Sequence, residues 1–132
     1  MEERPVLHPN QFQVNEAWIV FKLNDHPIRT EQDGDFDLIA LMDAASCFIL
    51  SSELVPANGA EPTELESRRL LQQGQAHKKQ LPKTLFVPSG QPAQFLAAAA
   101  RRKGIEVVHV EESQLLVFIG EDRERFRDRI ES

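Results

Sequence analysis

Eight basic side chains lie between residues 67 and 103 of this 132-residue chain, with no acidic side chain among them, and such a run could bind phosphate groups. The flanking segments are acidic, with net charges of −10 over residues 1–66 and −4 over residues 104–132. The alternative is that the cations pair with these segments, in the same chain or in a second copy, and we favour it because the pI is about 5.2. The predicted basic surface consists of Arg68, Arg69, Lys78, Lys79, Arg101, Arg102 and Lys103.

A second candidate for anion binding is Ser89-Gly90-Gln91, which precedes a predicted helix. The first amides of a helix have no partner within it and can hold an anion. The segment has no glycine-rich repeat and no lysine after it, so an ordinary helix cap made by Ser89 or Gln91 explains it as well.

Single polar residues offer less chemistry. Cys47 would need a histidine partner, His77 or His109, to act as a nucleophile, and a lone cysteine beginning an apolar strand is usually a core residue. Asp43 ends a predicted strand, where an aspartate commonly makes local turn hydrogen bonds. The four histidines have no metal-ligand spacing, so we predict no metal site. Because the sequence contains no strong catalytic or cofactor motif, we also predict no cofactor and no catalytic residue.

Short apolar runs predict the strands that carry these residues, and a tight turn over residues 43–46 joins two of them into a hairpin. The polar stretch over residues 24–35 is expected to be a loop or a wide hairpin connection. The strands are expected over residues 17–23, 36–42, 47–55, 81–87, 105–110 and 115–119.

Three helices are predicted. Thr63 and Glu66 have the spacing of a capping box, which predicts a surface helix that ends near residue 77. A last helix is expected over residues 121–130 and would use Phe126 and Ile130. The most regular helix is expected over residues 92–103, with a buried face of Phe95, Leu96, Ala99 and Ala100.

The predicted fold class is α/β, or α+β, with a mixed sheet: an antiparallel hairpin unit, then a parallel β-α-β unit with a right-handed crossover, with the helices packed on the sheet. This order resembles the ribonuclease H-like fold. Residues 37–53, Asp-Leu-Ile-Ala-Leu-Met-Asp-Ala-Ala-Ser-Cys-Phe-Ile-Leu-Ser-Ser-Glu, look like the central hairpin of integrase and transposase cores. The resemblance covers residues 15–131.

Nucleases of this kind hold two metal ions with an acid on the first strand, one after the fourth strand and one on a late helix. This chain departs from that pattern, because residues 17–23 contain no carboxylate, the nearest being Asp25, and Ser89 stands before glycine where the family has an acid. The resemblance therefore implies a scaffold without catalytic activity. Only the late helix has suitable acids, which are Glu121, Asp122, Glu124 and Asp128.

We therefore expect a non-catalytic interaction or scaffold domain that forms a homo-oligomer, most simply a dimer, or binds another protein. The alternative is a phosphate-directed nucleic-acid binder or a degenerate metal-dependent nuclease, although the acidic pI argues against a nucleic-acid partner.

One cysteine, no basic apolar leader and no apolar run near the roughly 20 residues of a membrane span predict a cytoplasmic protein without membrane contact. Residues 1–14 are expected to form an irregular lead-in, and residues 15–132 a single domain. In its small size and acidity, the chain is similar to proteins carried on mobile gene cassettes.

Overall fold

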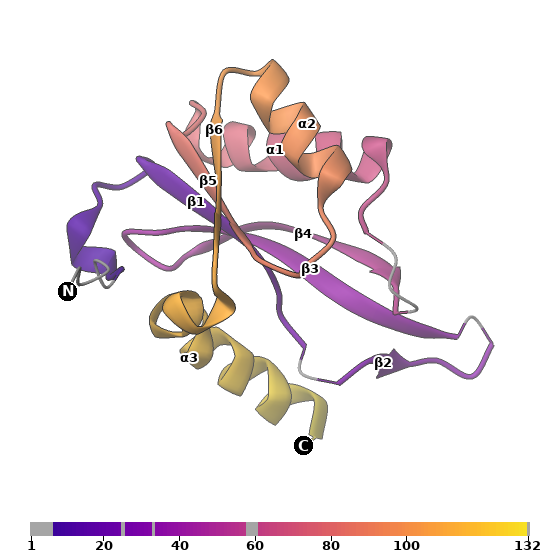
Figure 1. Ribbon diagram of the computed structural model, residues 1–132. Coiled ribbons are helices and arrows are strands. Elements are labelled where there is room, and N and C mark those ends of the chain that lie inside the picture. The colour runs from indigo at the N-terminus through magenta and orange to yellow at the C-terminus, as the bar shows by residue number, and fades with distance from the viewer. Residues whose placement is uncertain (1–6, 25, 33, 58–60, 132) are drawn as a thin grey trace.

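The computed structural model describes residues 7–24, 26–32, 34–57 and 61–131. Residues 130 and 131 are described by their backbone alone. After a single 3-10 turn at Pro9–Gln11, the chain alternates strands and helices (Figure 1). The elements are β1 (Ala17–Lys22), β2 (Ile28–Arg29), β3 (Asp35–Asp43), β4 (Ile49–Pro56), α1 (Glu64–Lys78), β5 (Thr84–Pro88), α2 (Gln94–Arg102), β6 (Glu106–Val110) and α3 (Glu112–Glu131).

The strands form one mixed sheet in the order β4-β3-β1-β5-β6, and the short strand β2 lies beside the start of β3. β1, β3 and β4 pair antiparallel, whereas β5 pairs parallel with both β1 and β6. The predicted combination of an antiparallel hairpin unit and a parallel β-α-β unit is confirmed.

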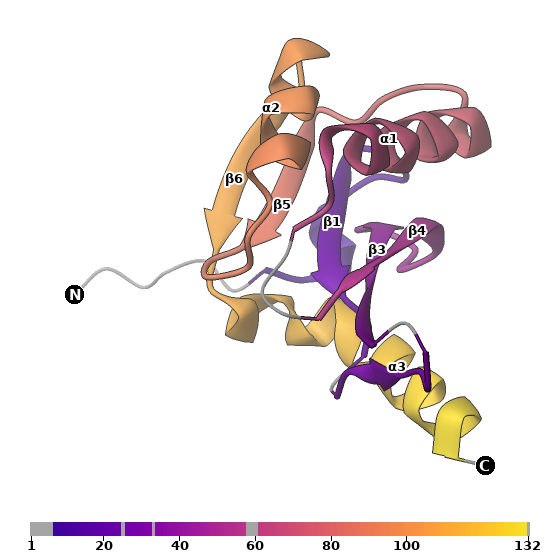
Figure 2. The ribbon, with the colours of Figure 1, turned by 90° about the vertical axis from the view of Figure 1, so that its right-hand side faces the viewer.

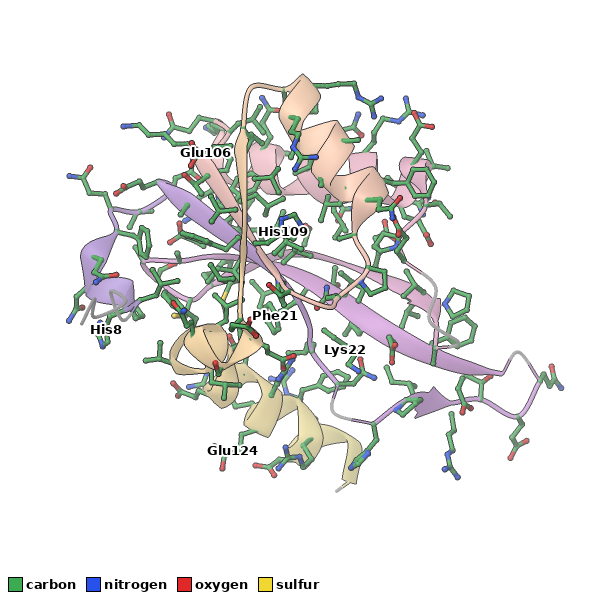
Figure 3. The ribbon with its side chains drawn as sticks, in the orientation of Figure 1. His8, Phe21, Lys22, Glu106, His109 and Glu124 are labelled. Carbon is green, nitrogen blue, oxygen red and sulfur yellow. The ribbon has the colours of Figure 1, made fainter. Side chains whose placement is uncertain are left out.

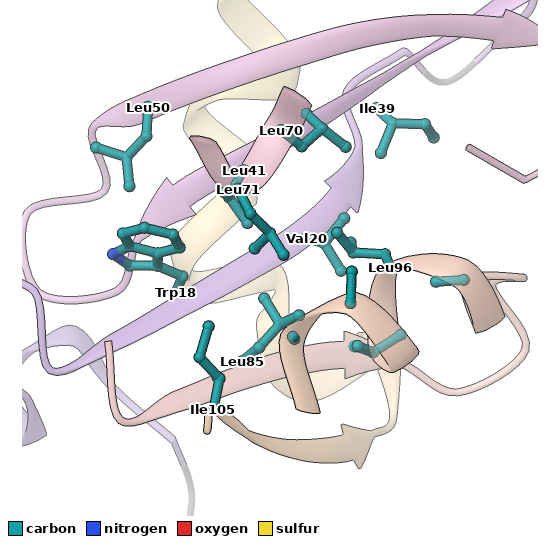
Figure 4. Packing of buried hydrophobic residues seen from close by; sticks show 14 of the residues in the cluster. Trp18, Val20, Ile39, Leu41, Leu50, Leu70, Leu71, Leu85, Leu96 and Ile105 are labelled. Atoms are coloured by element: carbon teal, nitrogen blue, oxygen red, sulfur yellow. The ribbon is translucent and has the colours of Figure 1, made fainter. Parts of the chain in front are cut away.

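Helices cover both faces of the sheet, with α1 and α2 on one side and α3 on the other (Figures 1 and 2). β1 is apolar on both faces because alternate side chains enter different cores: Trp18 and Val20 pack with α1 and α2, while Ile19 and Phe21 pack with α3. Figure 4 shows the first of these cores, where Leu96 of α2 lies over the same face as Trp18. Among the described residues, no helix combines the length and apolar character that a membrane span requires.

The predicted turn between β3 and β4 is present and is built around the fully buried carboxylate of Asp43. Its Oδ2 accepts hydrogen bonds from the backbone N–H of Ser46 at 2.9 Å and from the Ser46 hydroxyl at 2.7 Å. Its Oδ1 accepts from the backbone N–H of Asn15 at 2.6 Å, and the side chain of Asn15 accepts from Nε1 of Trp18 at 2.7 Å. Cys47 has a left-handed φ of 60°, so β4 begins at Ile49 and not at Cys47 as predicted.

The strand predicted over residues 115–119 is wrong, because these residues belong to the single long helix α3. Leu115, Phe118 and Ile119 are buried against the sheet, while Leu116 and Val117 are about half exposed. This is helical spacing, with buried positions three and four residues apart. A continuous apolar run of five residues does not by itself distinguish the two periods.

The predicted buried face of α2 also needs correction, since Phe95 is 49% exposed. Leu96, Ala99 and Ala100 are buried as predicted, and Ala97 takes the place expected for Phe95. The capping prediction for this helix is wrong as well, because the N-cap is Ala93 and no side chain caps it there. The carboxylate of Glu61 instead accepts a hydrogen bond from the N–H of Phe95 at 2.9 Å. The capping box of Thr63 and Glu66 on α1 is confirmed.

Gly74 lets α1 approach the sheet closely, since a Cβ atom there would lie 3.0 Å from the Trp18 ring and 3.2 Å from Leu41 Cδ2. Gly74→Ala should gain about 1 kcal/mol of helix propensity but lose about 1–3 kcal/mol by forcing the indole aside. We therefore expect a net loss of up to about 2 kcal/mol in denaturant melts.

Gly120→Ala on α3 is the matched control, because nothing lies within 4 Å of its Cβ position and only the propensity gain should remain. A Gly74→Ala variant stabilised as much as Gly120→Ala would show that the close approach to Trp18 is not a constraint.

Candidate functional site at the ends of β1 and β5

Polar side chains from four parts of the chain line a pocket of about 390 Å³ at the carboxyl ends of the parallel strands β1 and β5. Open α/β sheets commonly bind ligands at such strand ends. The polar and glycine residues of its lining are Lys22, Asp37, Ser89, Gly90, Gln91, Glu112 and Arg123.

Arg123 holds α3 against the end of β1. Its side chain is only 12% exposed, its Nε donates to the backbone carbonyl of Lys22 at 2.9 Å, and one terminal nitrogen donates to Glu112 Oε1 at 2.6 Å. The sequence interpretation missed both residues. No spacing rule would have paired them, because residues eleven positions apart on a straight helix lie about 16 Å apart along its axis.

The other two charged groups of the pocket come from β1 and β3. Asp37 Oδ1 accepts a hydrogen bond from the side-chain amide of the buried Asn24 at 3.0 Å, and Asn24 Oδ1 accepts from the backbone N–H of Leu38. The pocket therefore contains two cations, Lys22 and Arg123, and two carboxylates that already accept hydrogen bonds. Within the described parts of the chain, no three histidine, cysteine, aspartate or glutamate residues are grouped as a metal ion requires.

The predicted anion-binding residues Ser89, Gly90 and Gln91 all line this pocket, as a turn that follows β5. Gly90 has a left-handed φ of 88°, and the backbone N–H of Gln91 donates to the Pro88 carbonyl at 3.1 Å. Nε2 of Gln91 is buried and has no hydrogen-bond partner among the described residues. The α2 N-terminus was expected to be able to hold an anion with its first backbone amides. In the structure the N–H of Phe95 already donates to the Glu61 carboxylate.

The predicted basic surface is divided among several places. Arg69 pairs with Glu53 of β4 at 2.8 Å, and Arg102 lies 3.9 Å from Glu64. Arg68, Arg102 and Lys103 line a groove between α1 and α2, whereas Arg101 lines a separate hollow beside His109. Lys78 and Lys79, at the far end of α1, are about 15 Å along the helix from Arg68.

The acids of α3 that the resemblance singled out do not line the pocket. Burial raises the pKa of Asp122, and the neighbouring Glu121 adds to this, while Arg125 acts in the opposite direction. Glu121 pairs with Arg125 at 2.5 Å, and Glu124 is exposed on the outer side of α3 (Figure 3). Asp128 is also exposed. Asp25 lies outside the described residues.

Cys47 is half-buried, and its surroundings oppose a nucleophilic role. Burial raises the pKa of its thiol most, and the negative charges of Asp122, Asp43 and Glu121 raise it further.

We expect native Cys47 to react with iodoacetamide more slowly than free cysteine at about pH 8, because less thiolate is present. Asp122→Asn should speed the reaction and Arg125→Ala should not; faster reaction of the native thiol than of free cysteine would contradict the raised pKa.

No family model matches the chain, and no curated protein matches it. Solved structures do. The catalytic core of BIV integrase matches 87% of this chain and 68% of its own, with 13% identity and a TM-score of 0.55. The HTLV-2 integrase catalytic core, in complex with magnesium and in dimeric form, matches 83% and 82% of the two chains, with 14% identity and a TM-score of 0.51.

A chain of the simian T-cell lymphotropic virus intasome, in complex with PP2A regulatory subunit B56 gamma, matches 96% of this chain. This chain covers 40% of that longer one, with 16% identity and a TM-score of 0.56. Together with the sheet order and the placement of the helices, these likenesses identify the fold of this chain as ribonuclease H-like, of the kind seen in retroviral integrase catalytic cores.

Proposed function

We propose that this chain is a non-catalytic interaction domain built on the ribonuclease H-like fold, and that it associates with a second copy of itself or with another protein. The observation that carries the proposal is the position of Arg123. Its guanidinium lies between the end of β1 and Glu112 in the pocket where the strand ends and α3 meet.

A pair of divalent metal ions needs several carboxylates with oxygens free to coordinate them. In this pocket Glu112 is already paired with Arg123, and Asp37 is hydrogen-bonded to Asn24. Lys22 and Arg123 add two positive charges, which repel a cation. At the end of β1, Phe21 packs into the core beneath α3 (Figure 3). These features support a site that has no metal-dependent chemistry.

The test is an assay for cleavage of single- and double-stranded DNA and RNA with Mg²⁺ or Mn²⁺, alongside light scattering to measure mass. We expect no cleavage and a mass above that of one chain. Cleavage by the wild type would overturn the proposal if Glu112→Gln or Asp37→Asn abolishes it. The control is Glu124→Gln on the outer side of α3, which should then leave the cleavage intact.

A second candidate function is the binding of a small phosphate- or carboxylate-bearing ligand in the same pocket. The buried, unpartnered Nε2 of Gln91 favours it, because such a donor costs free energy until it meets an acceptor. Lys22 could neutralise the anion.

Pyrophosphate should then raise the melting temperature of the wild type. Lys22→Gln and Gln91→Leu should lose that shift, and the control Lys79→Gln should keep it. No shift with the wild type would exclude pyrophosphate as a ligand.

A further inference from the structure

The outer edge of β6 carries backbone groups with no partner in the described chain. β6 is the last strand of the sheet and pairs with β5 alone. The N–H of Glu106 donates to the Lys83 carbonyl and the carbonyl of Val110 accepts from the N–H of Ser89, so residues 106, 108 and 110 bond to β5. The N–H and C=O groups of Val107 and His109 therefore point away from the sheet.

This edge lacks several of the features that usually prevent a strand from pairing with another. β6 contains no proline, lysine or bulge, whereas β4 at the opposite edge has an irregular register with β3 and ends at Pro56. Figure 2 shows β6 at the margin of the sheet, with α2 on its inner side and α3 below it. Glu106 and His109 are exposed on this strand (Figure 3).

We propose that β6 pairs antiparallel with β6 of a second copy about a two-fold axis at Val108, which joins the two sheets into one. This deepens the proposed self-association by naming its interface, and it rests on that part of the proposed function. In this register Val107 of one copy lies opposite His109 of the other. All four outward groups of each strand are then used, which gives four hydrogen bonds between the copies.

The charges beside β6 favour a second copy as the occupant, in this orientation. A basic run, Arg101 to Lys103, leads into the strand, and the acidic residue Glu111 follows it. Antiparallel pairing brings the basic entry of each copy next to the acidic exit of the other, at both ends of the interface. Within the paired strands, Glu106 faces Val110 of the second copy, so no like charges lie opposite each other.

Cross-linking tests the register directly. Opposite residues of a non-hydrogen-bonded antiparallel pair have Cα atoms about 4.5 Å apart, which suits a disulfide. In a Cys47→Ala background, Val108→Cys should form a disulfide-linked dimer on mild oxidation. His109→Cys should not, because the two copies of residue 109 are not opposite each other. Equal cross-linking of both variants, or of neither, would overturn the proposed pairing.

Light scattering tests the interface without a new covalent bond. His109→Pro removes an outward N–H and no bond to β5, so it should give a folded monomer, whereas His109→Ala keeps that N–H and should stay dimeric. Lys103→Glu should weaken the dimer about two- to tenfold, and adding Glu111→Lys should restore it. Circular dichroism checks that each variant is folded.

The outcomes separate this proposal from the wider one. A wild type that stays monomeric at its highest soluble concentration would overturn self-association and, with it, the second copy as the occupant of β6. A dimer that survives His109→Pro would overturn only the β6 interface. Neither result changes the cleavage assay, which tests the absence of catalysis.

Discussion

Asp43→Ala is expected to lower the free energy of unfolding by about 3–5 kcal/mol, because it removes a charged acceptor from two backbone donors. The N–H of Asn15 is buried and would lose its partner, and the N–H of Ser46 would lose the bond that closes the turn into β4. Asn15 also holds the Trp18 indole, so the damage should reach the core beneath α1. Denaturant melts followed by circular dichroism measure the loss.

Two variants separate the parts of this network. Ser46→Ala removes only a hydroxyl on an exposed residue and should cost less than about 1 kcal/mol. Asp43→Asn keeps one acceptor oxygen and should fall between the two, at about 1–3 kcal/mol. If Asp43→Ala proved as mild as Ser46→Ala, the buried carboxylate would not be organising the turn.

Leu96→Ala is expected to cost about 2–5 kcal/mol and the neighbouring Phe95→Ala less than about 1 kcal/mol, although phenylalanine is the larger side chain. The difference follows from burial: Leu96 is fully buried between α2 and the sheet, whereas about half of Phe95 is exposed. The two variants also share a helix, so changes in helix propensity nearly cancel between them. Urea melts of both, under one set of conditions, give the comparison.

The opposite ranking, with Phe95→Ala costing more, would mean that α2 is rotated about its axis relative to the arrangement described. Ala98→Ser on the exposed side of the same helix is a suitable reference, because it changes no buried contact and should stay within about 0.5 kcal/mol of the wild type.

Local signals in the sequence were enough to predict the elements whose ends are set by nearby residues. The capping box of Thr63 and Glu66 located the start of α1, and the polar turn after Asp43 located the hairpin. The apolar run of β1 indicated a strand covered on both faces, which is its position in the sheet. The order of these elements was then sufficient to predict the mixed sheet and the ribonuclease H-like arrangement.

The sequence-based predictions were wrong where a residue distant in the chain determines the local structure. Helix α2 was expected to be capped by a residue just before it, yet its amide bonds to Glu61, thirty-four positions earlier in the chain. The rotation of α2 follows from its packing beside α1, which the pattern of Phe95 and the alanines does not specify.

The pocket was found only in part for the same reason. Ser89, Gly90 and Gln91 were predicted from their turn chemistry, whereas Lys22, Asp37, Glu112 and Arg123 join them only through the tertiary fold. The strand predicted over residues 115–119 also divided α3, so that Glu112 and Arg123 were not assigned to the same helix.

The sheet order has a consequence for how this chain folds. β3 and β4 are joined by a short turn, and β5 and β6 by one helix, so each half can assemble from contacts close in sequence. Within the sheet, the two halves are joined where β1 pairs with β5, and Ala17 opposite Thr84 closes a long loop. Loop closure of this length is entropically costly, so we expect the joining of the halves to limit the refolding rate. The single tryptophan, Trp18, lies on that seam opposite Leu85 and should report this step by its fluorescence.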